Sequence, residues 1–302
     1  MKYALYLGCT IQNEQYGCEI SARETFPLLG VELVDMEGTS CCGLPAFSSL
    51  STLGWWYLST RNIAIAERKG LDILALCNGC YESLVQTKHN LDKDPDLQKM
   101  INDKLSVEGL EYTSTSKIIH PISLLHDVIG VETIEERVER PLKGLKFASH
   151  PGCHAIRPSI LGMPDHPEHP QKMDALITAL GAETMDYPEK TDCCGSMLAS
   201  AAASTTLTIT AKKLKAVESY GFDGLVTTCP FCFQMFDGRQ GEINDMIDFL
   251  LDTEPDEVEL PIFYYTQLLG LALGMKPDRL GLQLNKSPVD RLLGEVEEGL
   301  DN

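Results

Sequence analysis

The sequence predicts an α/β fold with two pseudo-symmetric domains. Each is a small, mainly parallel sheet flanked by helices, with cysteine motifs at the carboxyl ends of strands. Three observations support this fold class. Five cysteines recur with similar spacing in each half of the 302-residue chain. Short apolar segments alternate with helical ones, as in parallel α/β domains. Each cysteine group also comes shortly after an apolar segment.

The first half is expected to alternate strands with helices. The expected strands are 3–7, 31–35 and 73–76, and the expected helices are 19–29 and about 53–69. Gly30 and Gly70 follow the two helices directly, where a glycine commonly caps a helix. Each strand leads to a cysteine motif, and a further helix is expected after the last of them.

The second half repeats this order. A strand from residue 147 is expected before its first cysteine, followed by a helix at 171–180, a strand at 182–186, a helix at 199–219 and a strand at 225–228. The start and the end of the repeat are offset by 144 residues and the middle cysteines by 152, so the second half gains eight residues after Cys153 and loses eight after Cys232. Four prolines mark residues 155–170 as the loop that holds the gained residues. We expect a first domain over 1–143 and a second over 144–302.

Ten of the eleven cysteines belong to the repeat. They are Cys9, Cys41, Cys42, Cys77 and Cys80 in the first half, and Cys153, Cys193, Cys194, Cys229 and Cys232 in the second. Because the carboxyl ends of parallel strands share one edge of a sheet, the groups should converge. Thiolates bind iron–sulfur clusters or zinc. A closed zinc site needs four ligands and leaves one cysteine over, and a thioredoxin-like redox pair uses only two.

Composition excludes several classes of protein. A net charge of −19 without a basic cluster argues against nucleic-acid binding. No apolar stretch reaches the roughly 18 residues of a membrane span. The N-terminus lacks the features of an export signal, which favours a cytoplasmic protein. In a reducing cytoplasm, clustered cysteines indicate metal binding or catalysis rather than disulfides.

Some residues allow two interpretations. Gly43 and Gly195 directly follow the paired cysteines, where glycine permits either close approach to a bulky inorganic group or a plain turn. Cys18 has no cysteine counterpart and is expected to be a small buried residue. His120 and His126 are expected in packing or surface roles. The pair Trp55–Trp56 is expected to pack within a helix.

The motifs resemble a known family. The pattern Cys-x31-Cys-Cys-Gly-x33-Cys-x2-Cys, followed by Cys-x39-Cys-Cys-Gly-x33-Cys-x2-Cys, resembles the duplicated CCG cysteine-rich domain. Nearly the whole chain is similar to the heterodisulfide reductase B subunits of methanogenic archaea, including the segments 77–82, 149–154 and 229–233. The stretch between CCG and Cys-x2-Cys is one or two residues shorter than the usual form, equally in both halves.

This resemblance implies an iron–sulfur enzyme. Each half would hold a non-cubane [4Fe-4S] cluster on its five cysteines, and the pair would reduce the mixed disulfide of coenzyme M and coenzyme B to two thiols in one-electron steps. The partners implied are a ferredoxin-like C subunit with cubane [4Fe-4S] clusters and a flavin-containing A subunit, with a hydrogenase or formate dehydrogenase as an optional further partner. The chain has no dinucleotide fingerprint, so we expect no flavin in it.

Two other functions stay open at this level. The chain could be the electron-transfer subunit of a lactate, glycolate or glycerol-phosphate dehydrogenase, or of a quinone-linked succinate or fumarate enzyme. It could also be a zinc-stabilised assembly protein without redox chemistry. In a heterodisulfide reductase, both arms of the substrate would be anionic. We therefore expect Arg157, helped by His154, to bind one arm, since arginine pairs well with oxyanions.

Overall fold

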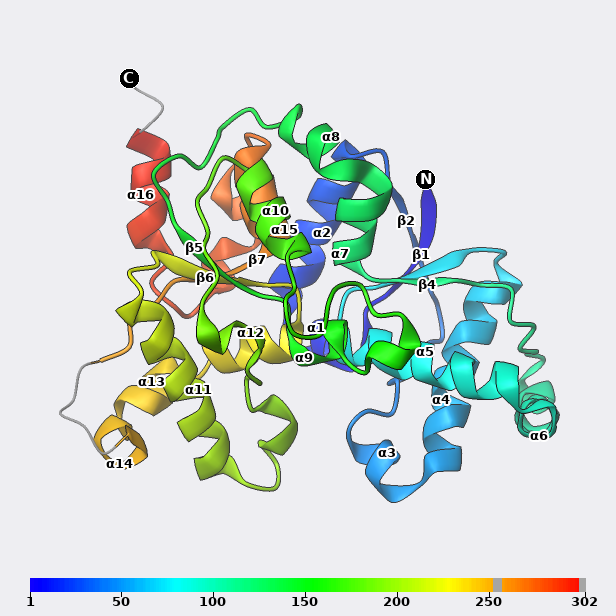
Figure 1. Ribbon diagram of the computed structural model, residues 1–302. Helices are drawn as coiled ribbons and strands as arrows, with labels where there is room; N and C mark the ends of the chain where they lie inside the picture. The colour runs from blue at the N-terminus through cyan, green and yellow to red at the C-terminus, as the bar shows by residue number, and fades with distance from the viewer. Residues whose placement is uncertain (252–256, 299–302) are drawn as a thin grey trace.

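The computed structural model describes residues 1–251 and 257–298. Within these residues the chain forms two parallel sheets, one in each half (Figure 1). The strand order is β2-β1-β3-β4 in the first sheet and β5-β6-β7 in the second. Helices flank both sheets. The predicted α/β fold with two similar halves is confirmed.

The first half follows the predicted alternation. Its strands are β1 (Lys2–Tyr6), β2 (Glu32–Asp35), β3 (Asp72–Ala75) and β4 (Ile118–Ile119). Its longer helices are α2 (Tyr16–Leu28), α4 (Thr52–Arg68), α5 (Asn78–Lys93) and α6 (Pro95–Leu105). Shorter helices are α1 (Gly8–Asn13), α3 (Ala46–Leu50), α7 (Pro121–Ser123) and α8 (Val131–Glu135), with a 3-10 turn η1 (Ser106–Glu108) and a π-helical segment η2 (Leu124–Gly130).

The second half repeats this plan with shorter elements. Its strands are β5 (Phe147–His150), β6 (Gly224–Thr227) and β7 (Ile262–Tyr264). Its helices are α9 (Cys153–Ile156), α10 (Lys172–Ala179), α11 (Ala203–Ser219), α12 (Pro230–Phe236), α13 (Gln240–Asn244), α14 (Ile247–Leu251), α15 (Tyr265–Ala272) and α16 (Asp290–Glu298). Its 3-10 turns are η3 (Ser159–Leu161), η4 (Pro188–Thr191), η5 (Ser196–Leu198), η6 (Pro277–Leu280) and η7 (Leu282–Leu284).

The strands are parallel, which aligns their ends, and all except the outer strands β2 and β4 are largely buried. Tyr3 of β1 pairs with Leu33 of β2 on one side and with Asp72 of β3 on the other. In the second half, Phe147 of β5 pairs with Gly224 of β6. Strands buried on both faces form continuous apolar runs, which is why the segments of β1, β3 and β6 were recognisable in the sequence. Each sheet therefore presents the carboxyl ends of its strands along one edge.

Two expected elements differ in the structure. The strand expected at 182–186 is wrong: only a single bridge joins Glu183 to Lys146, and the chain then leaves β5 toward η4. The helix expected from residue 199 begins at Ala203, because Ser196–Leu198 form a separate 3-10 turn. Sequence reasoning also missed β4 and β7. These strands are only two and three residues long, and they are recognised by their pairing with β3 and β6.

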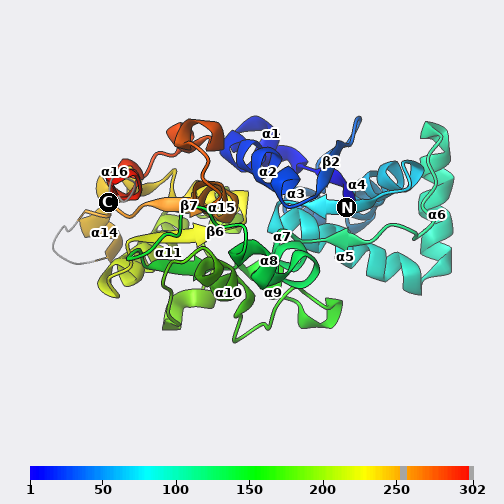
Figure 2. The same ribbon diagram turned by 90° about the horizontal axis from the view of Figure 1, so that it is seen from above.

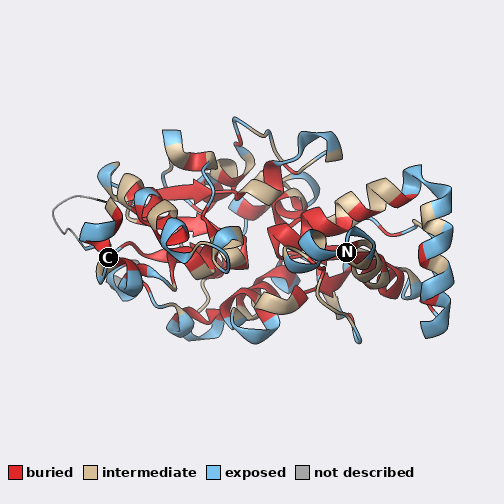
Figure 3. Ribbon diagram, turned by 90° about the horizontal axis from the view of Figure 1, so that it is seen from below, coloured by how far each residue is buried: buried red, intermediate tan, exposed pale blue. Residues whose placement is uncertain are grey.

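The two halves interlock. Helix α15 packs on α2 of the first half, where the hydroxyls of Ser21 and Thr266 lie 2.6 Å apart, and α8 packs on α10 of the second half (Figure 2). Buried residues form one hydrophobic cluster that runs through both halves, while the outer faces of the helices are exposed (Figure 3). The boundary after residue 143 stays a prediction. None of the helices in the described part of the chain is long and apolar enough to cross a membrane.

Candidate metal centre

The cysteines lie where strands end. Cys77 and Cys229 lie two residues after the ends of β3 and β6 and occupy the N-cap positions of α5 and α12. Cys9 and Cys153 lie in the first turns of α1 and α9, just after β1 and β5. The paired cysteines lie in loops, after β2 in the first half and after η4 in the second. Because parallel strands end at one edge, segments far apart in the chain meet there.

In the first half, each thiol interacts with the next along a spatial row of five. The sulfurs of Cys9 and Cys41 are 3.7 Å apart. Hydrogen bonding from Cys41, and then from Cys80, lowers the pKa of the buried Cys42 thiol well below its usual value. Hydrogen bonding to Cys42 and Cys77 raises the pKa of Cys80. The five side chains therefore form a continuous run from Cys9 to Cys77.

The second half mirrors this run. Hydrogen bonding with Cys193 raises the pKa of Cys153, and the same contact lowers the pKa of Cys193. Cys194 interacts with Cys193 and with Cys232, and Cys232 with Cys194 and Cys229. The order of thiols is the same as in the first half.

The two runs meet in the middle of the molecule. A hydrogen bond with Cys229 is the largest of the effects that raise the pKa of Cys77. Burial opposes ionisation of Cys229, but hydrogen bonds from Cys232 and Cys77 lower its pKa. All ten cysteines of the repeat therefore lie in one continuous array, with Cys77 and Cys229 at its centre.

Access to the array is limited to its outer members. Cys9, Cys41 and Cys153 are half-buried and Cys193 is exposed. The other six are buried. A reacting molecule from solvent would therefore meet the first cysteine and the first member of the pair in each half.

Backbone amides support the outer sulfurs in both halves. The N–H of Gly43 donates to the Cys41 sulfur over 3.3 Å, and the N–H of Gly195 donates to the Cys193 sulfur over the same distance. Both glycines have positive φ, +93° and +87°. A Cβ on Gly43 would lie 2.9 Å from Trp55. Their close contacts are thus with the following helices, which fits the plain-turn interpretation.

Two further glycines were missed at the sequence level. Gly8 and Gly152 immediately precede the first cysteine of each half, with φ of +66° and +79°. A Cβ on Gly8 would lie 2.6 Å from the sulfur of Cys80, and one on Gly152 would lie 3.5 Å from the sulfur of Cys232. The signal was present in the sequence as a Gly-Cys pair repeated at the same offset in both halves.

The donor set suits a thiolate-bound cluster. Each half offers five thiols, one more than a tetrahedral zinc site uses. In the described part of the chain, no three His, Cys, Asp or Glu side chains converge on the position of a single ion. The number and softness of the donors, rather than a preformed single-ion geometry, therefore point to an iron–sulfur group.

Asn78 joins the two halves at the centre of the array. Its Nδ2 donates to the carbonyl of Pro151 over 2.7 Å, and its Oδ1 accepts from the Thr228 hydroxyl over 3.2 Å. His120 is fully buried and its Nε2 lies 2.9 Å from the same Oδ1. Burial lowers the pKa of His120 to about 3, so the ring is neutral. Since its Nδ1 accepts from the N–H of Ile122, its proton is assigned to Nε2.

The predicted substrate residues lie in different surroundings. His154 lies beside the array, with Nδ1 3.4 Å from the sulfur of Cys153. Arg157 is exposed, and its guanidinium donates to the Pro167 carbonyl over 3.0 Å within its own loop. The structure therefore places His154 at the site and Arg157 at its edge, engaged with the loop.

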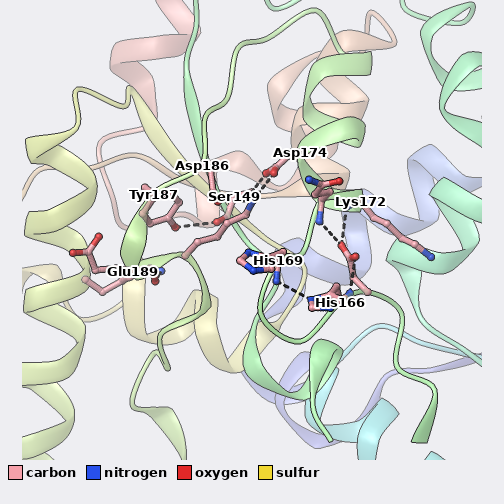
Figure 4. Close-up of polar contacts among 12 residues, drawn as sticks. Ser149, His166, His169, Lys172, Asp174, Asp186, Tyr187 and Glu189 are labelled. Atoms are coloured by element: carbon pink, nitrogen blue, oxygen red, sulfur yellow. Dashed lines mark hydrogen bonds and ion pairs between the residues drawn. The ribbon is translucent and has the colours of Figure 1, made fainter. Parts of the chain in front are cut away.

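The loop is held by its own side chains. Asp165 accepts hydrogen bonds from the backbone N–H groups of His166, Gln171 and Lys172. His166 accepts from the N–H of His169, as Figure 4 shows. The eight-residue gain is thus an ordered loop that contacts α5 of the first half through η3.

The remaining sequence expectations concern packing. Cys18 is buried outside the array, and burial raises the pKa of its thiol. Trp55 is buried in α4 and donates from Nε1 to the Ser83 hydroxyl over 2.5 Å. Trp56 is half-buried in the same helix. His126 pairs with Asp127 at 2.8 Å. All four have the packing or surface roles expected of them.

Comparison with known proteins places this geometry in a family. The model of the CCG cysteine-rich domain matches twice, over residues 3–85 and 147–237. The B subunit of the ferredoxin/F420H2-dependent CoB-CoM heterodisulfide reductase of Methanosarcina acetivorans is 36% identical, covering 98% of this chain and 97% of that protein. The 8-methylmenaquinol:fumarate reductase membrane anchor subunit of Wolinella succinogenes is 28% identical, covering 94% of this chain and 96% of that protein.

A solved structure shares the fold. A hypothetical protein from Helicobacter pylori superposes with a TM-score of 0.76 at 17% identity, over 94% of this chain and 51% of that longer chain. The two matches to the CCG domain and the 36% identity over nearly the full chain indicate the same family. The chain therefore belongs to the duplicated CCG cysteine-rich domain family and, within it, to the heterodisulfide reductase B subunits.

Proposed function

We propose that this chain is the catalytic iron–sulfur subunit of a heterodisulfide reductase, which reduces the mixed disulfide of coenzyme M and coenzyme B to two thiols. The single observation that carries the proposal is the continuous array of ten thiols that spans both halves. Full-length similarity to proteins named as the B subunit of CoB-CoM heterodisulfide reductase supports the substrate. The reaction consumes two electrons and two protons, and it breaks one sulfur–sulfur bond.

The cofactors proposed are two non-cubane [4Fe-4S] clusters. When bound, they would supply electrons one at a time. Cys9, Cys41, Cys42, Cys77 and Cys80 would hold one, and Cys153, Cys193, Cys194, Cys229 and Cys232 the other. The halves at 1–143 and 144–302 would then each be one cluster-binding domain.

The chain's own residues position these thiolates. The N–H groups of Gly43 and Gly195 stabilise charge on the outer sulfurs through hydrogen bonds. Asn78 ties Pro151 and Thr228 to the first half, which sets the distance between the two sites. The half-buried thiols leave the outer side open to a disulfide, and His154 lies next to Cys153 there.

Electrons would come from partner proteins. A ferredoxin-like C subunit with cubane clusters and a flavin-containing A subunit are the partners proposed, with a hydrogenase or formate dehydrogenase further upstream. The relatives' names describe one subunit of a larger enzyme. We therefore expect the isolated chain to reduce the disulfide with an artificial dye but not with ferredoxin, hydrogen or formate alone.

A second function is electron transfer within a quinone-linked fumarate enzyme. It is favoured by the similarity to the Wolinella succinogenes protein over nearly the full chain. It would use the same clusters but would not act on a disulfide.

Metal analysis and one activity assay separate these functions. Anaerobically purified protein should contain about eight iron and eight sulfide per chain, with a visible iron–sulfur absorption spectrum. Reduced dye should then be oxidised by the mixed disulfide. A colourless protein with stoichiometric zinc would overturn both redox proposals. Full iron without disulfide-dependent dye oxidation would leave the electron-transfer function.

A further inference from the structure

Equivalent positions behind the two thiol sets differ in charge. Ser59 donates to the carbonyl of Cys42 over 2.8 Å, and Thr210 donates to the carbonyl of Cys194 over 2.9 Å. The residue three positions later, on the same side of the helix, is Asn62 in the first half and Lys213 in the second. The repeat therefore exchanges a neutral amide for a lysine, one helical turn from the residue that contacts the Cys194 loop.

In the first half this position is neutral and fully hydrogen-bonded. Asn62 donates from Nδ2 to the Tyr6 hydroxyl over 3.0 Å, and its Oδ1 accepts from the N–H of Ser40 over 2.9 Å. Tyr6 in turn donates to the Ser40 carbonyl over 2.8 Å. Burial, followed by the nearby thiolates, raises the pKa of Tyr6 well above its usual value, so the hydroxyl stays protonated.

In the second half the position holds a buried lysine. Lys213 is only 2% exposed. Its Nζ donates to the Glu189 carbonyl and lies 4.8 Å from the centre of the Tyr187 ring. Tyr187 and Glu189 belong to the segment around η4, where the Tyr187 hydroxyl donates to the Ser149 carbonyl (Figure 4). Within the described residues Lys213 forms no ion pair.

The neighbour of Lys213 also differs from the first half. His150 takes the place of Tyr6, three residues before the first cysteine. It is 1% exposed, both ring nitrogens lack a hydrogen-bond partner in the described part of the chain, and its ring packs edge-on against Phe236 at 4.8 Å. His150 therefore offers no compensation for the charge of Lys213.

A buried ammonium group without an ion pair is costly unless a nearby negative charge balances it. Burial lowers the pKa of Lys213 to about 7, while Asp192, Glu189 and the thiolates of Cys232 and Cys194 act in the opposite direction. With a pKa of about 7, the ammonium form of Lys213 is partly populated near neutral pH, and the nearby negative groups, the thiolates among them, favour that form. By the same interaction, the ammonium form of Lys213 favours additional negative charge on the cluster proposed to bind to those thiolates.

We propose that Lys213 makes the second half the more easily reduced of the two iron–sulfur sites, so that an electron from the donor protein resides there in preference to the first half. The inference rests on the proposed binding of one cluster in each half. The step is the transfer of one electron from the reduced donor to the oxidised cluster, without forming or breaking a covalent bond in the protein, and the added negative charge favours the ammonium form of Lys213. Lys213 acts on the second site through its charge and does not take part in the chemical step.

Reduction potentials test this directly. Cluster-loaded protein would be titrated anaerobically with redox mediators and followed by electron paramagnetic resonance. In Lys213→Met, one of the two midpoint potentials should fall by at least about 59 mV, a tenfold change in a one-electron equilibrium. The other should not change. Lys213→Gln, which can still donate to the Glu189 carbonyl, should give the same shift if Lys213→Met is unstable.

Two matched variants separate charge from packing. Lys212→Met removes the same charge from the adjacent, exposed position of α11 and should shift neither potential. Lys213→Arg keeps the charge and should restore the higher potential. In a Cys194→Ser background, which disables the second site, Lys213→Met should leave the remaining first-half potential unchanged.

The outcomes distinguish the two levels of inference. Protein without iron and sulfide would refute the proposed function itself. Two clusters with potentials that do not respond to Lys213→Met or Lys213→Gln would refute only the role of Lys213. A shift of the first-half potential, or an equal shift in Lys212→Met, would refute it as well.

Discussion

Replacing Gly8 by alanine should disable the first thiol set. Gly8 has φ of +66°, a conformation that costs an L-residue about 1–2 kcal/mol. Its new Cβ would also lie 2.6 Å from the Cys80 sulfur, and such overpacking costs about 1–3 kcal/mol. Together these terms predict a loss of about 2–5 kcal/mol in the free energy of unfolding. The displaced Cys80 should also weaken binding of the proposed first-half cluster.

Gly109 provides a matched control for the backbone term. It has the same φ of +66°, but no atom lies within 4 Å of its added Cβ. Gly109→Ala should therefore cost only about 1–2 kcal/mol and keep all of its iron. Both variants would be purified anaerobically, analysed for iron and sulfide, and unfolded with urea. Gly8→Ala should retain about half of the eight irons expected from the proposed clusters. Equal stability of the two variants, with full iron in Gly8→Ala, would refute the contact with Cys80 as a constraint.

Three further predictions concern other residues. Cys42→Ser should abolish disulfide reduction and lower the iron content, because serine lacks the soft donor that the site needs. Cys18→Ser should keep both the activity and the iron, and it should lose about 1 kcal/mol of stability from a buried hydroxyl. Iron loss in Cys18→Ser would contradict the assignment of Cys18 as a packing residue. Lowering the pH from 7.5 to 5.5 should cost about 1.4 kcal/mol of stability through His120, since its pKa of about 3 in the folded state lets only the unfolded state take up the proton. In His120→Gln this share of the pH dependence should vanish. A slope of stability against pH that is unchanged in His120→Gln would show that the ring is not held neutral. Arg157→Ala should lower kcat/KM for the mixed disulfide roughly ten- to a hundred-fold at normal iron content; unchanged kinetics would show that the bond to the Pro167 carbonyl is its whole role.

Much of the fold could be predicted from the sequence because its signals are local. Strands β1, β3 and β6 are buried apolar runs that lead directly to a cysteine, and glycines mark the ends of the helices before β2 and β3. The expected strand at 182–186 failed because Glu183 makes only one bridge, with Lys146. Whether a short β-like segment pairs depends on its neighbour in the sheet, and that neighbour is set by tertiary packing.

The candidate site was predictable in membership but not in detail. The repeated spacing of the ten cysteines indicated that they act together, and the structure brings them into one array. The bond from Arg157 to Pro167 was not predictable, because the loop's conformation depends on backbone contacts such as those of Asp165. Side-chain direction in an inserted loop has no periodicity that a sequence pattern could reveal.

By itself, the sequence determined that the chain is a duplication, which cysteines are the candidate thiol donors, and that they follow strand ends, since spacing and apolar pattern are properties of the chain order. Only the tertiary structure decided that Cys77 meets Cys229, that Asn78 bridges the halves, and that Lys213 is buried without a carboxylate partner among the described residues. These features join residues from distant segments. Their contacts depend on how the two sheets and their helices pack, and the local pattern around each residue carries no record of its distant neighbour.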